Sequence, residues 1–412
     1  MHTDNAAKSH PSGCSTPSGV PPLRVFRSGS QRLEAAPAGR IETTSRAERL
    51  RGFGDELDAL KSRTMALMGP ADVAYVQRVD RFSRGMEIVG RVLIHFSFEP
   101  VGFLAGVFAL FVHKQLQTSE IGHTTLHGTY DRLEGAHRYS SKTFRWDVPI
   151  DEESWRHGHN VRHHGNTNIA GKDPDIHFGY VRLTEQTPYV PRAWWKLPLN
   201  VVFIWTNFAF VMNSHFTGLN DVFLDNGLPG KLDFLPDRSP ESVRVAWKRG
   251  LRKYVPYYLW NYGFFPALAG PFFWKVLLGN WLAETARDVY SAATIWCGHV
   301  GEDIKSWPEG TKARGRDEWY AMQVEASNDF RVSWPISVLC GGLDMQIEHH
   351  LFPALPPQRL RAIVPEVREI CRKYGVSYKT DSWGRTLWRA LGHIVRLARG
   401  EDGTREVMRA AA

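Results

Sequence analysis

Three short histidine clusters, far apart in the chain, constrain this protein more than any other feature of its sequence. They are His123-Thr-Thr-Leu-His127, His159-Asn-Val-Arg-His163-His164 and Gln346-Ile-Glu-His349-His350. In an α-helix, residues four apart share a face, so each spaced pair can direct both imidazoles to one point. Buried imidazoles need hydrogen-bond partners or a metal. The clusters therefore predict that three distant segments meet at one metal site, with His164 turned toward a neighbouring ion.

The number of imidazoles predicts more than one metal ion. The clusters supply seven histidines, and His299, in Trp296-Cys-Gly-His-Val-Gly301, is an eighth candidate. Zinc usually takes three or four protein ligands, so seven or eight suit two ions. Imidazole binds iron well, and iron suits redox chemistry, so we predict two irons. The predicted ligands are His123, His127, His159, His163, His164, His299, His349 and His350.

A carboxylate-rich di-iron bundle is an alternative arrangement that we reject. Glu120-x-x-His123 and Glu134-x-x-His137 formally match its Glu-x-x-His motifs. That bundle uses few histidines and leaves the second and third clusters unexplained. We interpret His137 and His157 as outer-sphere or surface residues. His2, His10 and His393 lie in terminal segments outside the clusters.

Long uncharged stretches predict membrane spans, since a span needs about 20 mostly apolar residues. Leu197–Asn220 and Tyr254–Trp274 contain no Lys, Arg, Asp or Glu, and Val276–Ala283 is a shorter uncharged piece. Val92–His113 is apolar apart from Glu99-Pro100, which fits one kinked span or a short hairpin. The alternative is a soluble helical core. Val289–Gly301 and Val332–Leu343 are too short to cross, so we expect core helices or re-entrant segments there.

The order of motifs agrees with a site on one membrane side. The two long uncharged stretches lie between His164 and Gln346, and two crossings return the chain to the side it left. We therefore predict an all-α membrane protein with a few transmembrane helices, expected to number four, and a helical cap that holds the metals.

Composition and patterning divide the chain into three parts. A hydrophobic fraction of 43% and a charged fraction of 23% exclude a disordered chain or a densely hydrophobic transporter. Residues 1–45 are rich in Pro, Gly and Ser and predict a disordered arm. Residues 46–383 are predicted to form the domain that carries the histidine clusters, beginning with a helix near Arg46–Met68. Residues 384–412 are predicted to form a basic amphipathic tail, which lies on an anionic membrane surface or is an ordinary solvated helix packed on the domain.

The motifs, in this order around a pair of spans, resemble the membrane fatty-acid desaturase family. Neighbouring phrases add to the resemblance: Trp155-Arg-His-Gly-His159, Gly165-Asn-Thr-Asn168, Gly171-Lys-Asp-Pro-Asp-Ile176 and Gln346-Ile-Glu-His-His-Leu-Phe-Pro353. The resemblance covers roughly residues 75–380 and is strongest to the bacterial branch that includes acyl-CoA desaturases. Gln346 stands where many members have histidine, so it is expected to orient a ligand or hold water.

The resemblance implies a helical membrane base and a cytosolic cap with two histidine-bound irons. The implied activity is O2-dependent insertion of a cis double bond into a long acyl chain, with acyl-CoA favoured over acyl-lipid. A fatty acyl hydroxylase on the same scaffold is the alternative, and a non-catalytic metal-binding membrane protein is a third. Second-shell carboxylates are expected to orient the imidazoles, with Asp173, Asp175 and Glu348 as candidates.

The expected partners follow from the same chemistry. The sequence has no Gly-x-Gly-x-x-Gly loop, no Cys-x-x-Cys cluster site and no His-Pro-Gly-Gly haem segment. Electrons from NAD(P)H are therefore expected through a separate ferredoxin-type carrier and its reductase. Membrane lipids and the acyl substrate are the other partners, and no nucleic acid is expected. The resemblance implies a bacterial inner-membrane enzyme with its active site on the cytoplasmic side.

Overall fold

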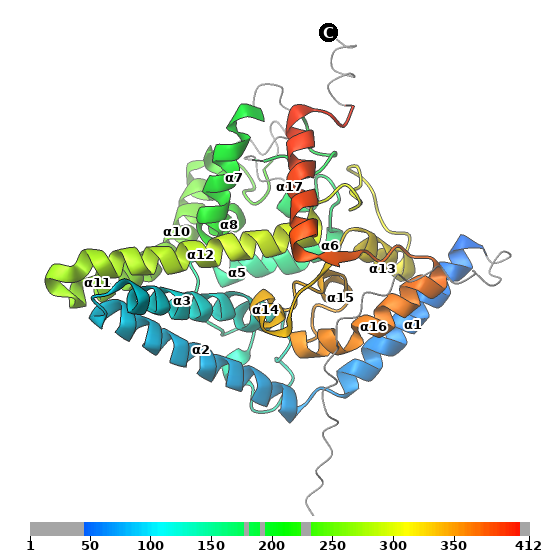
Figure 1. Ribbon diagram of the computed structural model, residues 1–412. Helices are drawn as coiled ribbons and strands as arrows, with labels where there is room; N and C mark the ends of the chain where they lie inside the picture. The colour runs from blue at the N-terminus through cyan, green and yellow to red at the C-terminus, as the bar shows by residue number, and fades with distance from the viewer. Residues whose placement is uncertain (1–44, 177–180, 190–193, 224–231, 404–412) are drawn as a thin grey trace, which may run out of the picture. The chain divides into compact units, whose positions relative to one another are not determined.

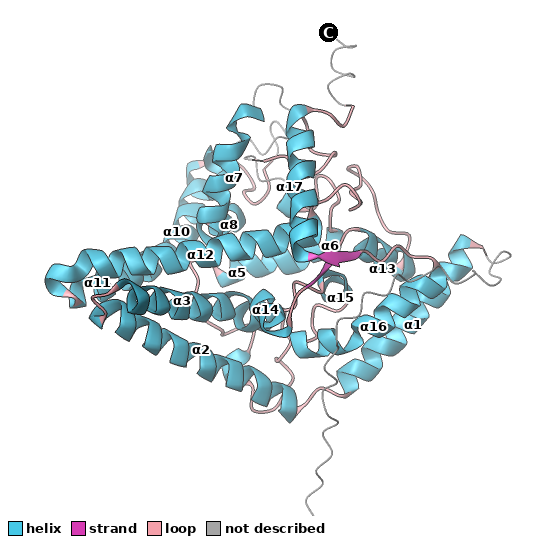
Figure 2. Cartoon of the chain, in the orientation of Figure 1, coloured by secondary structure: helices cyan, strands magenta, loops and turns pink. Residues whose placement is uncertain are grey.

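The computed structural model describes residues 45–176, 181–189, 194–223 and 232–403. The predicted arm, apart from Ser45, lies outside these residues, as do His2, His10 and the last nine residues of the predicted tail. Helices dominate the described chain (Figure 2). Its two strands, β1 (Asp329–Arg331) and β2 (Thr380–Ser382), pair in parallel. The helical class is thus confirmed, with one small sheet that the sequence did not predict.

The predicted first helix is present as α1 (Arg46–Ala66). Ser45 and Glu48 form a reciprocal capping box at its start, which satisfies backbone N–H groups that have no partner within the helix. Its apolar face buries Phe53, Leu57 and Leu60 against α13 (Arg316–Glu325) and α16 (Pro357–Tyr374). Figure 1 shows α1 and α16 side by side. This apolar cluster also holds α15 (Gln346–Leu351), the helix of the third histidine cluster.

Val92–His113 forms parts of two helices rather than one kinked span. α2 (Pro70–Phe96) and α3 (Pro100–Leu116) form a hairpin with extensive mutual contact (Figure 1). The Glu99 carboxylate accepts hydrogen bonds from the N–H groups of Val101 and Gly102 and so caps α3. Of the two arrangements that the sequence left open, the hairpin is the one present.

α12 (Phe273–His299) corrects the prediction of two separate pieces at Val276–Ala283 and Val289–Gly301. It is one helix of 27 residues, about 40 Å long at 1.5 Å per residue. The charged residues between the two apolar pieces are buried and paired. Arg287 lies 2.9 Å from Asp288 and 3.3 Å from Glu284, and Lys114 lies 3.4 Å from Glu284. Paired charges can be buried, so the helix continues through them.

The two long predicted spans are not single helices. Leu197–Asn220 breaks at Asn207 into α7 (Leu197–Thr206) and α8 (Phe208–Phe216), bent by 91°. Tyr254–Trp274 is divided among α10 (Pro240–Tyr258), the π-helical η6 (Leu259–Phe264), α11 (Phe265–Leu268), η7 (Gly270–Phe272) and the start of α12. Within the described ranges, no single helix has the length and apolar character to cross a bilayer, whereas the bent pair α7–α8 meets that test by length and composition.

The remaining elements are short, apart from the last helix. They are η1 (Gln117–His123), α4 (Thr124–Leu126), η2 (His137–Tyr139), α5 (Glu152–Trp155), η3 (Arg156–His163), α6 (His164–Asn166), η4 (Pro174–Ile176), η5 (Trp194–Lys196), α9 (Leu219–Phe223), α14 (Trp334–Cys340) and α17 (Trp383–Arg399). Gly341 ends α14 with a left-handed φ of 68°, which glycine adopts without strain.

The predicted C-terminal tail begins with a packed helix. α17 contacts α12 and buries Ala390, His393, Ile394 and Leu397. His393 is therefore part of the packed structure and not in a free arm, which corrects the sequence-based interpretation. The amphipathic spacing was visible in the sequence, but the surface that receives its apolar face belongs to α12, where Ala292 and Trp296 share a cluster with Ala390 and Ile394.

The α2–α3 hairpin offers a test of this packing. A Cβ on Gly106 would lie 2.8 Å from Leu93 Cβ and 2.9 Å from the Ile94 backbone nitrogen. We expect Gly106→Ala to lower the free energy of unfolding by about 1–3 kcal/mol, because two helix backbones must separate. Gly85→Ala in α2 is the control, since nothing lies within 4 Å of its Cβ, and it should be neutral or stabilising by up to about 1 kcal/mol. Equal Tm values for both variants in detergent would contradict the close contact.

Candidate metal centre

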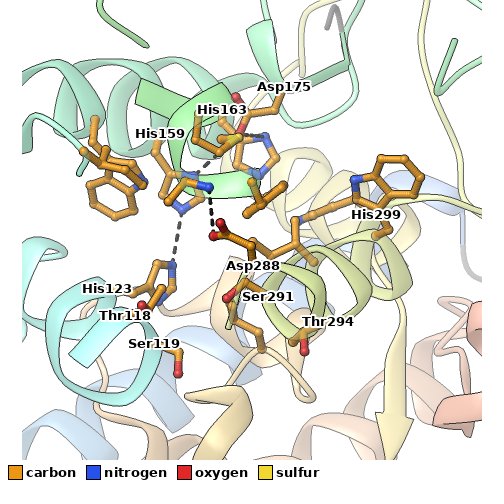
Figure 3. A pocket seen from close by; sticks show the side chains of 18 of the residues that line it. Thr118, Ser119, His123, His159, His163, Asp175, Asp288, Ser291, Thr294 and His299 are labelled. Carbon is orange, nitrogen blue, oxygen red and sulfur yellow. Dashed lines mark hydrogen bonds and ion pairs between the residues drawn. The ribbon is translucent and has the colours of Figure 1, made fainter. Parts of the chain in front are cut away.

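The structure brings four imidazoles from three segments into a first group. His123 ends η1, His127 follows α4, His159 lies in η3 and His349 lies in α15. One imidazole nitrogen from each of the four residues lies within 4.8 Å of the corresponding nitrogens of the other three. The Nε2 atom of His123 is 3.2 Å from that of His127 and 3.4 Å from that of His159. Figure 3 shows His123 and His159 directed toward each other.

A second group combines the other clusters with the end of α12. His163, His299 and His350 place their ligand nitrogens within the same 4.8 Å limit. The Nε2 atoms of His299 and His350 are 2.9 Å apart, and the Gln346 carboxamide nitrogen is 2.6 Å from His299 Nε2. Gln346 thus lies at this group, where the sequence suggested a role in orienting a ligand or holding water.

His159 and His163 lie side by side, although the helix that carries them is not the predicted α-helix. Their rings stack with centroids 5.1 Å apart, and their nitrogens lie within 4.8 Å of each other and of an Asp175 oxygen, while each also joins one of the two imidazole groups. η3 is a π-helix with i→i+5 hydrogen bonds, and it still keeps these two residues on one face. η1, which leads into the first cluster, is also π-helical. π-helical turns are frequent at functional sites.

His164 lies between the two groups. Its Nε2 is 3.3 Å from His159 Nε2, and its ring stacks on that of His350 with centroids 4.3 Å apart. Its Nδ1 is buried and has no hydrogen-bond partner. His137 and His157 lie exposed at the surface, one of the two places that the sequence suggested for them.

Outer hydrogen bonds orient the second group. His163 Nδ1 lies 3.0 Å from a carboxylate oxygen of buried Asp173, and His350 Nδ1 lies 3.0 Å from Gln323 Oε1. His299 Nδ1 lies 3.4 Å from the Ala326 carbonyl. A proton held on Nδ1 leaves the lone pair of Nε2 for a metal. Asp173 was a sequence candidate, but no motif in the sequence marks Gln323 or Ala326.

Asp175 and Glu348 differ from Asp173. Asp175 Oδ2 lies 3.6 Å from His159 Nδ1 and 3.7 Å from His163 Nδ1, close enough for electrostatic contact with both groups. Glu348 accepts a hydrogen bond from Tyr378 at 2.9 Å. Among the described residues, Glu348 has no hydrogen bond to an imidazole, so its predicted orienting role has no geometric support.

Burial and charge set the protonation of these groups. Burial lowers the pKa of His123 to about 3, which keeps the imidazole neutral and able to bind a metal. Burial also acts on His163, but the carboxylates of Asp173 and Asp175 outweigh it and raise its pKa to about 9. A metal ion bound by His163 would take the place of that proton beside the same carboxylates.

The donor set fits metal ions. His349 Nε2 and Gln346 Oε1 are buried without a hydrogen-bond partner, which is costly unless a ligand satisfies them. Neutral imidazoles suit iron and other first-row transition metals. The observed groups thus agree with the predicted chemistry of two ions, while iron itself stays a prediction.

A largely apolar cavity reaches both groups. It contains about 1100 Å³ of space free of atoms, counting its open part. His123, His159, His163 and His299 line it (Figure 3). Gln346 also belongs to its wall. Much of the remaining wall is apolar, with Trp146, Ile150, Trp155, Phe208, Met212 and Trp296 among its residues. A cavity of this kind takes an apolar ligand and holds it beside the imidazoles.

The fold and site define a class: a helical protein with two imidazole groups on the wall of an apolar cavity. A family model for fatty acid desaturases matches residues 98–382, close to the extent of the resemblance seen in the motifs. The chain belongs to the fatty acid desaturase family and is an enzyme that desaturates fatty acids.

Three relatives illustrate the range of the family. An NADPH-dependent stearoyl-CoA 9-desaturase of Mycobacterium tuberculosis is 30% identical over 351 residues, 82% of this chain and 78% of the relative. An sn-1 linoleoyl-lipid 6-desaturase of Synechocystis is 27% identical over 290 residues, 68% and 77% of the two chains. A Delta(5) fatty acid desaturase A of Dictyostelium discoideum is 24% identical over 284 residues, 67% of this chain and 58% of the relative.

Asp173 provides a test of the outer hydrogen bonds. We expect Asp173→Asn to weaken metal binding by about 10–100-fold, because the neutral amide no longer holds the Nδ1 proton of His163 as a carboxylate does. Chelator competition on the purified protein measures the change. Glu153→Gln is the control, since this side chain is exposed and lies outside both groups. Unchanged metal affinity in Asp173→Asn would show that the contact does not tune the site.

Proposed function

We propose that this enzyme introduces a cis double bond into a long acyl chain, with acyl-CoA favoured over acyl-lipid. Two adjacent methylenes lose two hydrogens while O2, two electrons and two protons yield two waters. One observation carries the proposal: both imidazole groups lie on the wall of the same largely apolar cavity. The name of the mycobacterial relative, a stearoyl-CoA 9-desaturase, supports the acyl-CoA substrate.

The chain's own residues would bind the acyl chain, orient the imidazoles and exclude water. Trp155, Phe208 and Met212 in the cavity wall exclude water and hold the acyl chain. Asp173 and Gln323 fix the orientation of two imidazoles. No side chain can deprotonate an unactivated methylene, so two iron ions would supply the O2-dependent oxidising chemistry.

The proposed ligands follow the two groups. His123, His127, His159 and His349 would hold one iron, and His163, His299 and His350 would hold the other. His164, between the groups, would serve as the eighth histidine ligand. Gln346 would complete the coordination of the second ion, either through its carboxamide oxygen or by holding a water molecule. The oxygen and nitrogen of a carboxamide exchange positions by a simple flip, so the contact with His299 is compatible with either role.

Exposed apolar side chains support a membrane base. Phe96, Phe98 and Val101 are each exposed by more than 70% at the turn of the α2–α3 hairpin. Leu268, Phe272 and Trp274 are exposed near the start of α12, where Phe98 packs edge-on against Phe272. A cluster of exposed large apolar side chains is typical of a membrane or partner surface. We propose insertion in a bacterial inner membrane, with four spans and the metal site in a cap on the cytoplasmic side.

Electrons would come from NAD(P)H through a ferredoxin-type carrier and its reductase. The sequence has no recognisable flavin, haem or iron–sulfur motif of its own. Expression with and without a compatible carrier, followed by mass spectrometry that locates double bonds in the lipids, tests the proposal. A hydroxylated product would favour the oxygenase alternative, and turnover with NADPH and no second protein would contradict the external carrier.

The division into two groups can be tested separately. We expect His349→Ala and His350→Ala each to abolish product, and each to lose mainly one of two irons, because the two residues belong to different groups. Iron analysis with Mössbauer spectroscopy on monodisperse protein distinguishes the remaining ions. His157→Ala, an exposed neighbour in η3, is the control and should keep both irons and activity. One tightly bound zinc and no iron in the parent protein would contradict the di-iron proposal.

A further inference from the structure

The last helix, α17, lies across the end of α12 beside α7 (Figure 1). Ala390 and Ile394 of α17 and Ile204 of α7 share an apolar cluster with Ala292 and Trp296 of α12. α17 also contacts η5, the turn that precedes α7. α2, α3 and α12 run together toward the hairpin end, whereas α7 and α17 run across that direction (Figure 1).

α17 has a buried stripe and an exposed basic face. Thr386, Ala390, His393, Ile394 and Leu397 are buried. The other side exposes Trp388, with 78% of its area accessible, and Val395. Four arginines flank these residues, each with between 41% and 66% of its side chain accessible: Arg385, Arg389, Arg396 and Arg399.

The charges on this face are unequal. Asp381 lies 3.3 Å from Arg385, 3.4 Å from Arg389 and 4.0 Å from Arg331, so one carboxylate faces three guanidinium groups. Arg396 and Arg399 have one acidic neighbour each, Glu302 and Glu401, which are themselves at least half exposed. An excess of positive charge remains at the surface around Trp388.

The neighbouring surface of η5 and α7 is apolar. Trp195 is 63% exposed, and Leu199 and Val202 are 70% and 59% exposed. α7 contains no charged residue. Exposed Trp beside aliphatic residues and arginine is the composition of helices that lie in the membrane interface, where Trp sits at the headgroup level.

We propose that the exposed face of α17, together with the apolar strip of η5 and α7, docks on an anionic phospholipid surface. Phosphate headgroups complement the arginines, while the acyl region receives Trp195, Leu199 and Val202. An acidic protein partner would leave that apolar strip uncovered, and a second copy would bring arginine against arginine. The proposal rests on the membrane association proposed above but not on the metals or the product.

Docking here would place lipid next to an approach to the metal groups. His393 of α17 lines a small cavity with Leu183, Asn168 and His299, and the last three also line the main cavity. Arg182, the neighbour of Leu183 in the chain, donates a hydrogen bond to the Leu397 carbonyl. This bond holds the segment of Arg182 and Leu183 against α17. An anionic surface held at α17 therefore adjoins the cap side of the cavity.

The test uses the full chain in lipid nanodiscs with a fluorophore at position 388. Trp388→Cys is labelled in a Cys14→Ser background, since Cys297, Cys340 and Cys371 are buried. In discs that contain phosphatidylglycerol, we expect quenching by neutral acrylamide to fall severalfold relative to discs of phosphatidylcholine alone. Added salt should reduce that difference through screening.

Two comparisons make the result specific. Adding Arg385→Gln and Arg389→Gln should remove the dependence on anionic lipid. A label at Arg372→Cys, on an exposed face of α16, should respond to neither lipid. Equal quenching at position 388 in both lipids, or a dependence that survives the arginine changes, would overturn the proposal. Failure of the proposed function is a separate outcome, seen as absent unsaturated product while the label at 388 still responds.

Discussion

The convergence of imidazoles from four distant segments is the constraint on which the structure around the cavity depends. Eight histidine rings lie in one buried region, and neutral imidazoles there are costly unless each nitrogen has a hydrogen-bond partner or a metal. The segments that carry them must therefore be held by other contacts. The apolar cluster of α1, α13 and α16 holds α15, and α12 holds His299 at its C-terminal end. The site is thus assembled by packing that lies outside it.

α12 runs as one helix from the end of the α2–α3 hairpin to the imidazole groups, with buried charged residues in its middle. Glu284, Arg287 and Asp288 are buried, and Lys114 of α3 reaches Glu284 while also donating to the Tyr257 hydroxyl. Breaking a buried pair by removing one partner usually costs several kcal/mol, roughly 3–5. The network therefore fixes α12 against α3 and α10, and the cavity runs along the same helix from Arg287 to Val300.

The sequence predicted the main content of the site but not its internal arrangement. The order and spacing of the histidines marked the seven rings of the three clusters, whereas His299 was an isolated candidate outside them. α1 follows directly from its apolar periodicity. The π-helical form of η3 could not be predicted, because a π-helical turn has no composition signal of its own. Gln323 and the Ala326 carbonyl contact the Nδ1 atoms of His350 and His299 only because the fold places them there, so no sequence motif could identify them. α12 was divided in the prediction because its buried charges look like a boundary until their partners on other helices are known.

The two groups differ in their electrostatic surroundings, and Asp175 connects them. The second group has the Asp173 carboxylate, a backbone carbonyl and a carboxamide on its Nδ1 atoms, which favours a higher positive charge on the metal it would hold. The first group consists of imidazoles, and the Asp175 carboxylate lies 3.6 Å from one of them, His159. Asp175 also lies 3.7 Å from His163 and lines the cavity. Burial raises the pKa of the Asp175 carboxyl above its ordinary value, to about 7. A single carboxylate between two unequal groups therefore couples their electrostatics at the wall where the acyl chain would lie.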